Sequence, residues 1–237
     1  MPADPNRRFA IPDAAGLTDD LDRNGWHILP QLLSADECHA LRASYDRDDL
    51  YRSTVHMQRH GFGRGEYRYF GYPLPDMIAA LRRSLYPPLA AVANAWAERL
   101  RQDAAYPAGH AAFLDDCREA GQARPTPLIL RYRAGDYNCL HQDLYGAMHF
   151  PLQVAILLSK PGDEFEGGEF VLTEQRPRMQ SRAQVVPLRQ GDAVVFAVNE
   201  APRIGARGPH RVKLRHGVSE VRRGERYALG IIFHDAA

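Results

Sequence analysis

The feature that most constrains the fold is a series of short apolar runs after about residue 125. Most runs are rich in β-branched or aromatic residues, and Gly or Pro lies between many of them, as is typical of short strands joined by turns. The runs are PLILRYR, FPLQVAILLS, GEFVLT, AQVVPL, AVVFAV, RVKLRHGVSEV and RYALGIIFH. This number of strands predicts a sandwich or barrel, and a jelly roll fits best because its two sheets can close around a pocket.

The first half of the chain predicts helices instead. Residues 17–46 are typical of a helix, a short strand and a second helix, and residues 77–85 and 88–102 have helical periodicity. Residues 52–75, rich in Gly, Arg and aromatic side chains, resemble a functional loop more than a core element. We therefore expect one domain over 1–237 that is mainly β. A helical part and a substrate loop would occupy 1–125, and a jelly-roll core (a double-stranded β-helix) flanked by these helices would occupy 126–237.

Bulk properties exclude several classes of protein. Hydrophobic residues make up 45% and charged residues 25% of the chain, which is ordinary for a soluble globular protein. No apolar run approaches the roughly 20 residues of a membrane span, and the N-terminus lacks the apolar core of a secretory signal, so we expect a cytoplasmic protein. The three cysteines (Cys38, Cys117 and Cys139) include no CxxC pair, which argues against a disulfide framework or a structural zinc site.

A candidate metal site begins with His141 and Asp143. Residues two apart in a strand point to the same side, so this pair could hold one metal from a single element. The third ligand must come from far along the chain. His210 and His216 are the main choices, and His149 and His234 are the less favoured ones.

The position of Arg226 favours His216 over His210. Arg226 follows His216 by ten residues, on the strand expected after the Gly224 turn, whereas Glu220 stands at that offset from His210. A neutral His and a cation so arranged suit a metal-bound dicarboxylate, because the Arg can pair bidentately with the distant carboxylate. Two His and one Asp leave three open positions on an octahedral metal, as in non-haem iron oxygenases. A zinc site would usually close to four ligands.

Alternation along the last predicted strand leaves room beside this arginine. The face that carries Arg226 is lined mostly by small residues (Ala228, Gly230 and Ile232). The opposite face is bulky and suits packing against the helices; its residues are Tyr227, Leu229, Ile231 and Phe233.

Taken together, four segments in this order resemble the 2-oxoglutarate/iron(II) dioxygenases: LRYRAGDYNCLHQD, GGEFVL, GDAVVFA and HGVSEVRRGERYAL. The resemblance implies that His141, Asp143 and His216 bind iron(II) and that Arg226 binds the far carboxylate of 2-oxoglutarate. Tyr132 matches a tyrosine that helps to hold the co-substrate in several members, although a barrel-wall aromatic is an equal alternative. The resemblance also implies that O2 oxidises a substrate while 2-oxoglutarate loses CO2, and it admits ascorbate as an accessory reductant.

The substrate is less constrained. The tail RVKLRHGVSEVRRGERYALGIIF resembles a bacterial branch that is expected to act on nucleic acids, and RYRAGDYNCLHQD is similar to a segment of the oxidative nucleic-acid demethylases. This chain departs from the demethylases in having Leu130 where they carry Asn, and only His234 as a basic residue after Arg226.

Local charge is consistent with a nucleic-acid partner. Residues 174–226 contain twelve Lys/Arg and five Asp/Glu. The loop expected at 52–75 adds a basic set that could contact phosphate and aromatic rings that could stack on bases. The basic set is Arg59, His60, Arg64 and Arg68, and the aromatics are Phe62, Tyr67, Tyr69, Phe70 and Tyr72. A substrate lid or an ordinary surface loop would have the same composition, and a cationic pocket would equally suit an acidic metabolite or peptide.

Three hypotheses therefore stay open. The first is an oxygenase that acts on a nucleic-acid base or nucleotide. The second is an oxygenase that acts on a protein side chain or a small metabolite. The third is a non-catalytic β-barrel protein that has kept a metal site, and the complete set of His141, Asp143, His216 and Arg226 counts against it.

Overall fold

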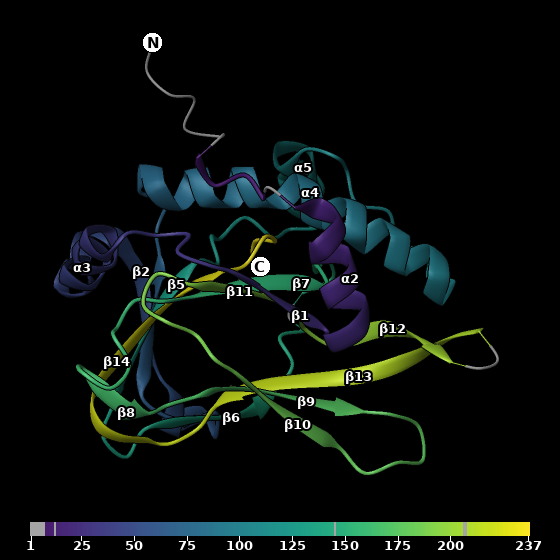
Figure 1. Cartoon of the computed structure of the whole chain (residues 1–237). Helices are drawn as coiled ribbons and strands as arrows, with labels where there is room; N and C mark the ends of the chain where they lie inside the picture. Colours follow the sequence, from purple (N-terminus) through teal and green to yellow (C-terminus); the bar gives the residue numbers. More distant parts are fainter. Residues whose placement is uncertain (1–7, 12, 145, 206–207) are drawn as a thin grey trace.

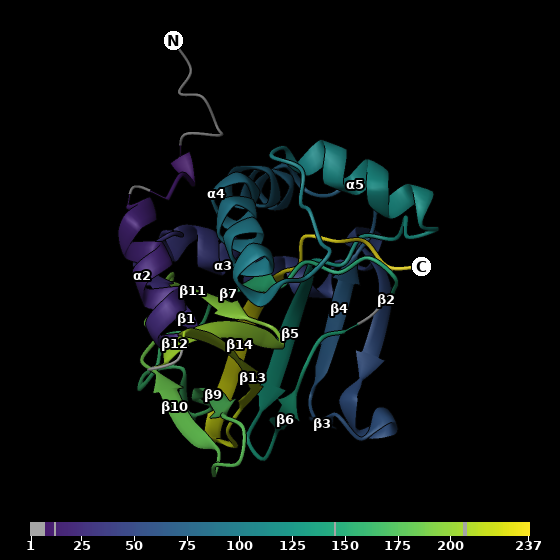
Figure 2. The ribbon, with the colours of Figure 1, turned by 90° about the vertical axis from the view of Figure 1, so that its right-hand side faces the viewer.

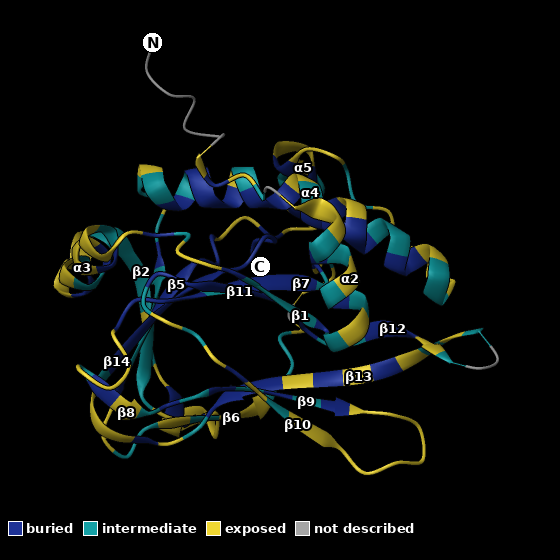
Figure 3. Cartoon of the chain, in the orientation of Figure 1, coloured by how far each residue is buried: buried dark blue, intermediate teal, exposed yellow. Residues whose placement is uncertain are grey.

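The computed structural model describes residues 8–11, 13–144, 146–205 and 208–237. Figure 1 shows three layers: a group of helices, a larger sheet beneath them and a smaller sheet below. The helices that cover the larger sheet are α2 (Ala14–Asn24), α4 (Asp76–Leu100) and α5 (His110–Glu119), and α3 (Ala35–Ala43) lies at one end. No helix of the described residues covers the outer face of the smaller sheet, where Figure 3 shows many exposed residues. The predicted fold class, a mainly β jelly roll flanked by helices, is confirmed.

The strands of both sheets pair antiparallel. The larger sheet has the order β1-β11-β7-β14-β5-β4-β2, with β8 beside β14. Its strands are β1 (Trp26–Leu29), β2 (Tyr51–His56), β4 (Glu66–Phe70), β5 (Leu128–Arg133), β7 (Leu152–Leu157), β8 (Phe165–Gly167), β11 (Ala193–Ala197) and β14 (Val221–Ile231).

The smaller sheet has the order β10-β9-β13-β6-β3, with β12 beside β13. Its strands are β3 (Gly63–Arg64), β6 (Tyr137–His141), β9 (Phe170–Gln175), β10 (Arg182–Val186), β12 (Glu200–Gly205) and β13 (Gly208–Val218). The hairpin of β12 and β13 extends beyond the barrel in Figure 1.

The prediction of a substrate loop over 52–75 is wrong, because this segment forms regular secondary structure. The segment contains most of β2, the short helix η3 (Met57–His60), β3 and β4. Strand β4 pairs with β5 and strand β3 pairs with β6, so this one segment joins both sheets at one side of the barrel, as Figure 2 shows. Strands that precede residue 125 therefore lie in the same sheets as strands that follow it. We keep the interpretation of a single domain over 1–237.

The helices differ from the prediction in two places. A break was expected near residue 87, yet α4 runs unbroken through Pro87 and Pro88. Proline removes a backbone hydrogen bond from a helix, but the apolar side chains before and after this pair (Leu85, Tyr86 and Leu89) are all buried, and their packing holds the helix together. Helix α5 was not predicted. The capping box of Ser34 and Glu37 is present at the start of α3.

The main core lies between the helices and the larger sheet. The bulky face of β14 joins this core, as expected, through Tyr227, Leu229 and Ile231, which share one apolar cluster with α4. The opposite face of β14 lines the space between the two sheets. Among the described residues, no helix has the length and apolar character needed to cross a membrane.

A buried ion pair fastens the C-terminus to α4. Arg82 and Asp235 are 1% exposed each and pair at 2.8 Å, and Arg82 also donates to the Ile232 carbonyl. Arg82→Met should lower the free energy of unfolding by about 3–5 kcal/mol, because Asp235 would stay buried without its partner. Denaturant unfolding measures this loss. The control Arg118→Met removes an exposed ion pair and should cost less than about 1 kcal/mol. Similar losses in both variants would contradict the assignment.

Candidate metal centre and co-substrate pocket

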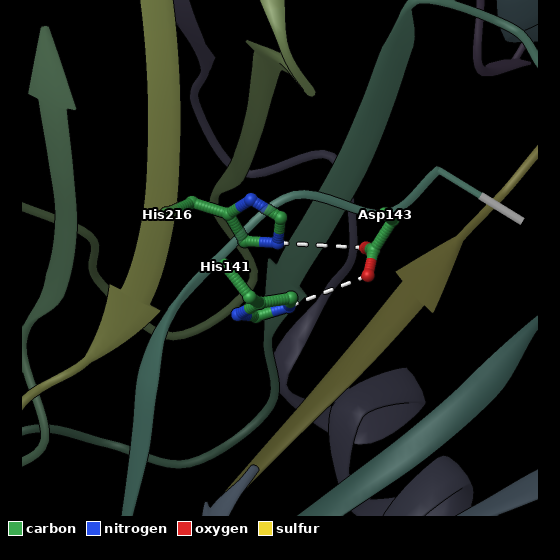
Figure 4. Close-up of side chains that lie close together, drawn as sticks. All are labelled: His141, Asp143 and His216. Atoms are coloured by element: carbon green, nitrogen blue, oxygen red, sulfur yellow. Dashed lines mark ion pairs between the residues drawn. The ribbon is translucent and has the colours of Figure 1, made fainter. Parts of the chain in front are cut away.

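Three side chains that could bind a metal meet between the two sheets. His141 ends β6, Asp143 follows two residues later, and His216 lies on the neighbouring strand β13, directly opposite His141. Their ligand atoms lie within 4.8 Å of one another. Figure 4 shows both imidazoles turned toward the same carboxylate: His141 Nε2 lies 3.4 Å from Asp143 Oδ1 and His216 Nε2 lies 3.5 Å from Oδ2.

The protonation states suit a metal ligand set. Burial would raise the pKa of Asp143, but its interactions with His141 and His216 outweigh burial and hold this pKa well below its usual range. Burial lowers the pKa of His216, which favours the neutral imidazole that binds metals. Burial lowers the pKa of His141 as well, but its interactions with Asp143 outweigh burial and raise this pKa. Asp143 thus offers an anionic oxygen to a cation, and each histidine offers a ring nitrogen once it has lost its proton.

The other histidines considered from the sequence lie apart from this cluster. His210 is on the extended part of the β12–β13 hairpin, opposite Arg203. His234 is buried in the core and accepts a hydrogen bond from the Phe150 amide, and His149 is exposed. Among the described residues, only His141, Asp143 and His216 form a group of metal-binding type.

The reasoning that paired His141 with Asp143 was wrong in its geometry. The two were expected on one face of one strand, but β6 ends at His141, and Asp143 lies in the irregular segment that follows. The side chains meet because the chain turns after the strand. Gln142 fixes this turn by donating from Nε2 to Asn199 Oδ1 and to the Leu214 carbonyl.

Arg226 faces the same cavity as the three side chains. This cavity has a volume of about 300 Å³, and the face of β14 that lines it carries Arg226, Ala228, Gly230 and Ile232, as the alternation predicted. Arg226 is 3% exposed, its Nε has no hydrogen-bond partner, and the guanidinium has no ion pair among the described residues. Burial lowers its pKa. A buried cation without a counterion is costly, so this end of the cavity suits an anionic ligand.

Tyr132 lies beside Arg226 on the adjacent strand. The two residues are direct neighbours in the pairing of β5 with β14, and the guanidinium carbon lies 5.6 Å from the centre of the tyrosine ring. Tyr132 is fully buried, and burial raises its pKa, so the hydroxyl keeps its proton. It can act as a hydrogen-bond donor in the cavity.

Several cavity residues were not singled out from the sequence. Gln153 on β7 is 4% exposed, and its Nε2 has no partner. The sequence could have indicated this residue, because Gln153 is the one amide side chain in the apolar run LQVAIL and alternation places it on the face toward the cavity. Asn138, Met57, Leu128 and Leu130 also line the cavity.

The aromatics of the segment 52–75 divide between the cavity and other places. Tyr67 and Tyr69 line the cavity and meet edge to face at 5.3 Å, and Phe62 lines it at its exposed rim. Phe70 is buried in the main core, and the hydroxyl of Tyr72 bonds to Asp235.

The basic residues of this segment are not equally available. Arg59, His60 and Arg64 are exposed and have no ion pair among the described residues, and the His60 ring stacks on Phe62 at 5.3 Å. Arg68, expected in the same set, instead pairs with Asp48 and donates to the Tyr45 carbonyl at 2.6 Å. Arg68 therefore supports the fold and cannot serve as a free phosphate contact.

Comparisons with known proteins identify the family of the chain. A family model described as an oxygenase catalysing oxidative methylation of damaged DNA matches residues 65–236. The uncharacterized proteins Rv2227 and MT2286 of Mycobacterium tuberculosis are each 48% identical over 168 residues, which cover 71% of this chain and 72% of each relative.

Solved structures share the fold at low sequence identity. A 2OG-Fe(II) oxygenase family oxidoreductase from Burkholderia pseudomallei aligns with a TM-score of 0.56 and 18% identity, over 96% of this chain and 95% of that one. A prolyl-4-hydroxylase from Pseudomonas putida aligns with a TM-score of 0.54 and 17% identity, over 95% of this chain and 100% of that one. Because the family model spans well over half of the sequence, the chain belongs to the family of oxygenases described as catalysing oxidative methylation of damaged DNA.

Proposed function

We propose that this oxygenase uses iron(II) and 2-oxoglutarate to oxidise an alkyl group on a nucleic-acid base. The observation that carries the proposal is the buried guanidinium of Arg226, which forms no ion pair within the described part of the chain. It lies on the wall of the cavity that also holds His141, Asp143 and His216. A dicarboxylate that binds the metal at one end and Arg226 at the other would satisfy both groups.

Each residue then has a defined part. His141, Asp143 and His216 would hold iron(II) and leave three of its octahedral positions for ligands that react. Iron(II) supplies the chemistry by which O2 and 2-oxoglutarate become CO2, succinate and a hydroxylated substrate. Arg226 would orient the co-substrate through its far carboxylate, and the Tyr132 hydroxyl would donate a hydrogen bond beside it.

The atoms of the proposed reaction balance if it is an oxidative demethylation. One oxygen atom of O2 enters succinate and the other enters a C–H bond of the methyl group. A hydroxymethyl group on a base nitrogen leaves as formaldehyde, which restores the N–H of the base. The family description supports damaged DNA as the substrate class. The proposed location of such an enzyme is the cytoplasm.

The cavity wall suits a planar base. Tyr67 and Tyr69 form an aromatic wall, and Leu128 and Leu130 continue it on β5. Aromatic side chains stack on bases, and exposed cations contact the backbone of a single strand. Phe62 at the rim offers a surface for stacking, and the exposed side chains of Arg59 and Arg64, close to it in the sequence, are candidates for contacts with the backbone.

The test is turnover of a short single-stranded oligodeoxynucleotide that carries one N-methylated base. The reaction contains iron(II), 2-oxoglutarate and ascorbate, and the proposed part of ascorbate is limited to keeping the iron reduced. We expect release of succinate and loss of the methyl group, which mass spectrometry detects. The unmethylated oligonucleotide and a proline-rich peptide serve as controls. Turnover of the peptide without turnover of the methylated strand would replace this proposal with hydroxylation of a protein.

Tyr67→Leu should raise the KM for the methylated oligonucleotide about tenfold or more. The substitution removes a stacking surface, and base–aromatic stacking contributes about 1–3 kcal/mol. The affinity for 2-oxoglutarate should stay close to that of the unmodified enzyme, because Tyr67 lies away from Arg226 on the sheet, opposite Leu130 on β5. The matched control is Tyr137→Leu, which removes an exposed tyrosine of β6 outside the cavity lining. An equal effect in both variants would argue against a stacking role.

A further inference from the structure

An irregularity in β6 decides which way His141 points. His216 is opposite His141 and Val218 is opposite Asn138, so Cys139 and Leu140 together face a single residue of β13. This two-against-one pairing is a β-bulge, a feature found often beside active sites, where it can redirect a side chain.

The bulge reverses the alternation of the strand. Asn138 and His141 both line the cavity although they stand three positions apart, and Cys139 and Leu140 are both exposed. In a regular strand, residues three apart face opposite sides. Without the extra residue, a strand that kept Asn138 in the cavity would turn His141 outward.

The bulge also fixes the ring of His141. His141 Nδ1 lies 2.8 Å from the Cys139 carbonyl, within the bulge itself. A carbonyl can only accept a hydrogen bond, so Nδ1 is the donor and Nε2 is the ring nitrogen left to bind a metal. Nε2 lies on the side of Asp143. The Cys139 amide donates to the Phe62 carbonyl at 2.9 Å, which ties the bulge to β3 and the rim of the cavity.

Two glycines on the flanking strands leave space for this conformation. A Cβ on Gly217 of β13 would lie 2.7 Å from the Asn138 carbonyl oxygen and 3.2 Å from that of Cys139. A Cβ on Gly63 of β3 would lie 2.4 Å from the Tyr137 carbonyl oxygen, and the φ of Gly63 is +124°. Any other residue at either position would push backbone atoms of the bulge, which cannot move aside like a flexible side chain.

We propose that Gly217 and Gly63 are positioning residues for the metal site: by accommodating the bulge at Cys139–Leu140 they hold His141 in the orientation and tautomer that bind the metal. The inference rests on the proposed function, since it takes His141 as a ligand. It adds two residues that offer no side chain to the metal or the co-substrate and act through the backbone of a neighbouring strand.

The experiment uses Gly217→Ala in the metal-free full chain with Mn(II) as the probe. Calorimetric titration should show an affinity for Mn(II) about ten- to a hundredfold weaker, the usual loss when support for a ligand is disturbed. Long-range ¹H–¹⁵N NMR of the imidazoles should show the Nδ1–H tautomer of His141 in the unmodified protein and its loss in the variant. The control is Gly71→Ala, whose Cβ would come no closer than 3.7 Å to any neighbour.

The outcomes separate the inference from the proposed function. If the unmodified protein does not bind Mn(II), the metal site itself is refuted, and the inference with it. If the unmodified protein binds Mn(II) and Gly217→Ala binds it equally with the same His141 tautomer, the positioning role is refuted alone. Circular dichroism checks the fold of each variant. Should Gly217→Ala fail to fold, Gly63→Ala approaches the same bulge from the other side and is judged by the same two measurements.

Discussion

Replacing Arg226 with alanine should weaken the binding of 2-oxoglutarate about a hundredfold or more and leave the affinity for the metal almost unchanged. Arg226 is buried, has no counterion among the described residues and stands on a strand that carries none of the three candidate ligands. Loss of one partner of a buried, hydrogen-bonded charge pair costs about 2–5 kcal/mol, and each 1.4 kcal/mol corresponds to about a factor of ten in affinity.

Anaerobic titration of the iron(II)-loaded protein with 2-oxoglutarate measures this loss through the metal-to-ligand charge-transfer band. Arg226→Lys should recover part of the affinity, because a lysine keeps the charge but not the bidentate geometry. The control is Arg223→Ala, on the same strand but exposed and paired with Glu166. If Arg226→Ala binds 2-oxoglutarate as tightly as the unmodified enzyme, the cavity does not hold the co-substrate in the proposed way.

The position of Arg226 could be predicted because it depends on local periodicity. Alternation along β14 is regular, so the small residues beside Arg226 line the cavity and the bulky ones reach the core, as expected. A regular strand carries its own information about which side chains share a face. The capping box at the start of α3 is equally local, because Ser34 and Glu37 are only three residues apart.

The orientation of His141 could not be predicted, because it depends on residues far away in the sequence. The bulge in β6 is accommodated by Gly63 and Gly217, from two different strands, and no pattern within β6 announces it. Alternation along a strand predicted that His141 and Asp143 lie on one side of β6. The structure brings the two side chains together for a different reason, since Asp143 lies beyond the end of the strand.

The prediction of a loop over 52–75 was wrong for a related reason. Its glycines and charges are typical of a loop, yet it supplies strands to both sheets, and its charges are partly used inside the fold. Arg68 pairs with Asp48, and Glu66 pairs with Arg131 of β5. Composition shows which groups a segment offers, but only the tertiary structure shows which of them stay free for a partner.

The choice between His216 and His210 yields the second prediction with a large effect. Both histidines lie on β13. Because they are six positions apart, they face the same side of the strand, so periodicity cannot distinguish them. Their distance from the cluster does distinguish them, because six residues of strand span roughly 20 Å. His210 lies in the part of β13 that pairs with β12, and this hairpin projects beyond the barrel in Figure 1. Of the two histidines, only His216 lies beside Asp143.

His216→Ala should therefore weaken Mn(II) binding by more than about a hundredfold, beyond the loss expected for a residue that merely supports a ligand. His210→Ala should keep the affinity of the unmodified protein and is the matched control, since it removes the same side chain from the same face of the same strand. Calorimetric titration of the metal-free proteins compares the two, with circular dichroism to check their folds. If His210→Ala lost Mn(II) and His216→Ala kept it, the cluster between the sheets could not be the metal site, and the assignment of Arg226 to a metal-bound dicarboxylate would fail as well, because its offset from His216 would lose its meaning.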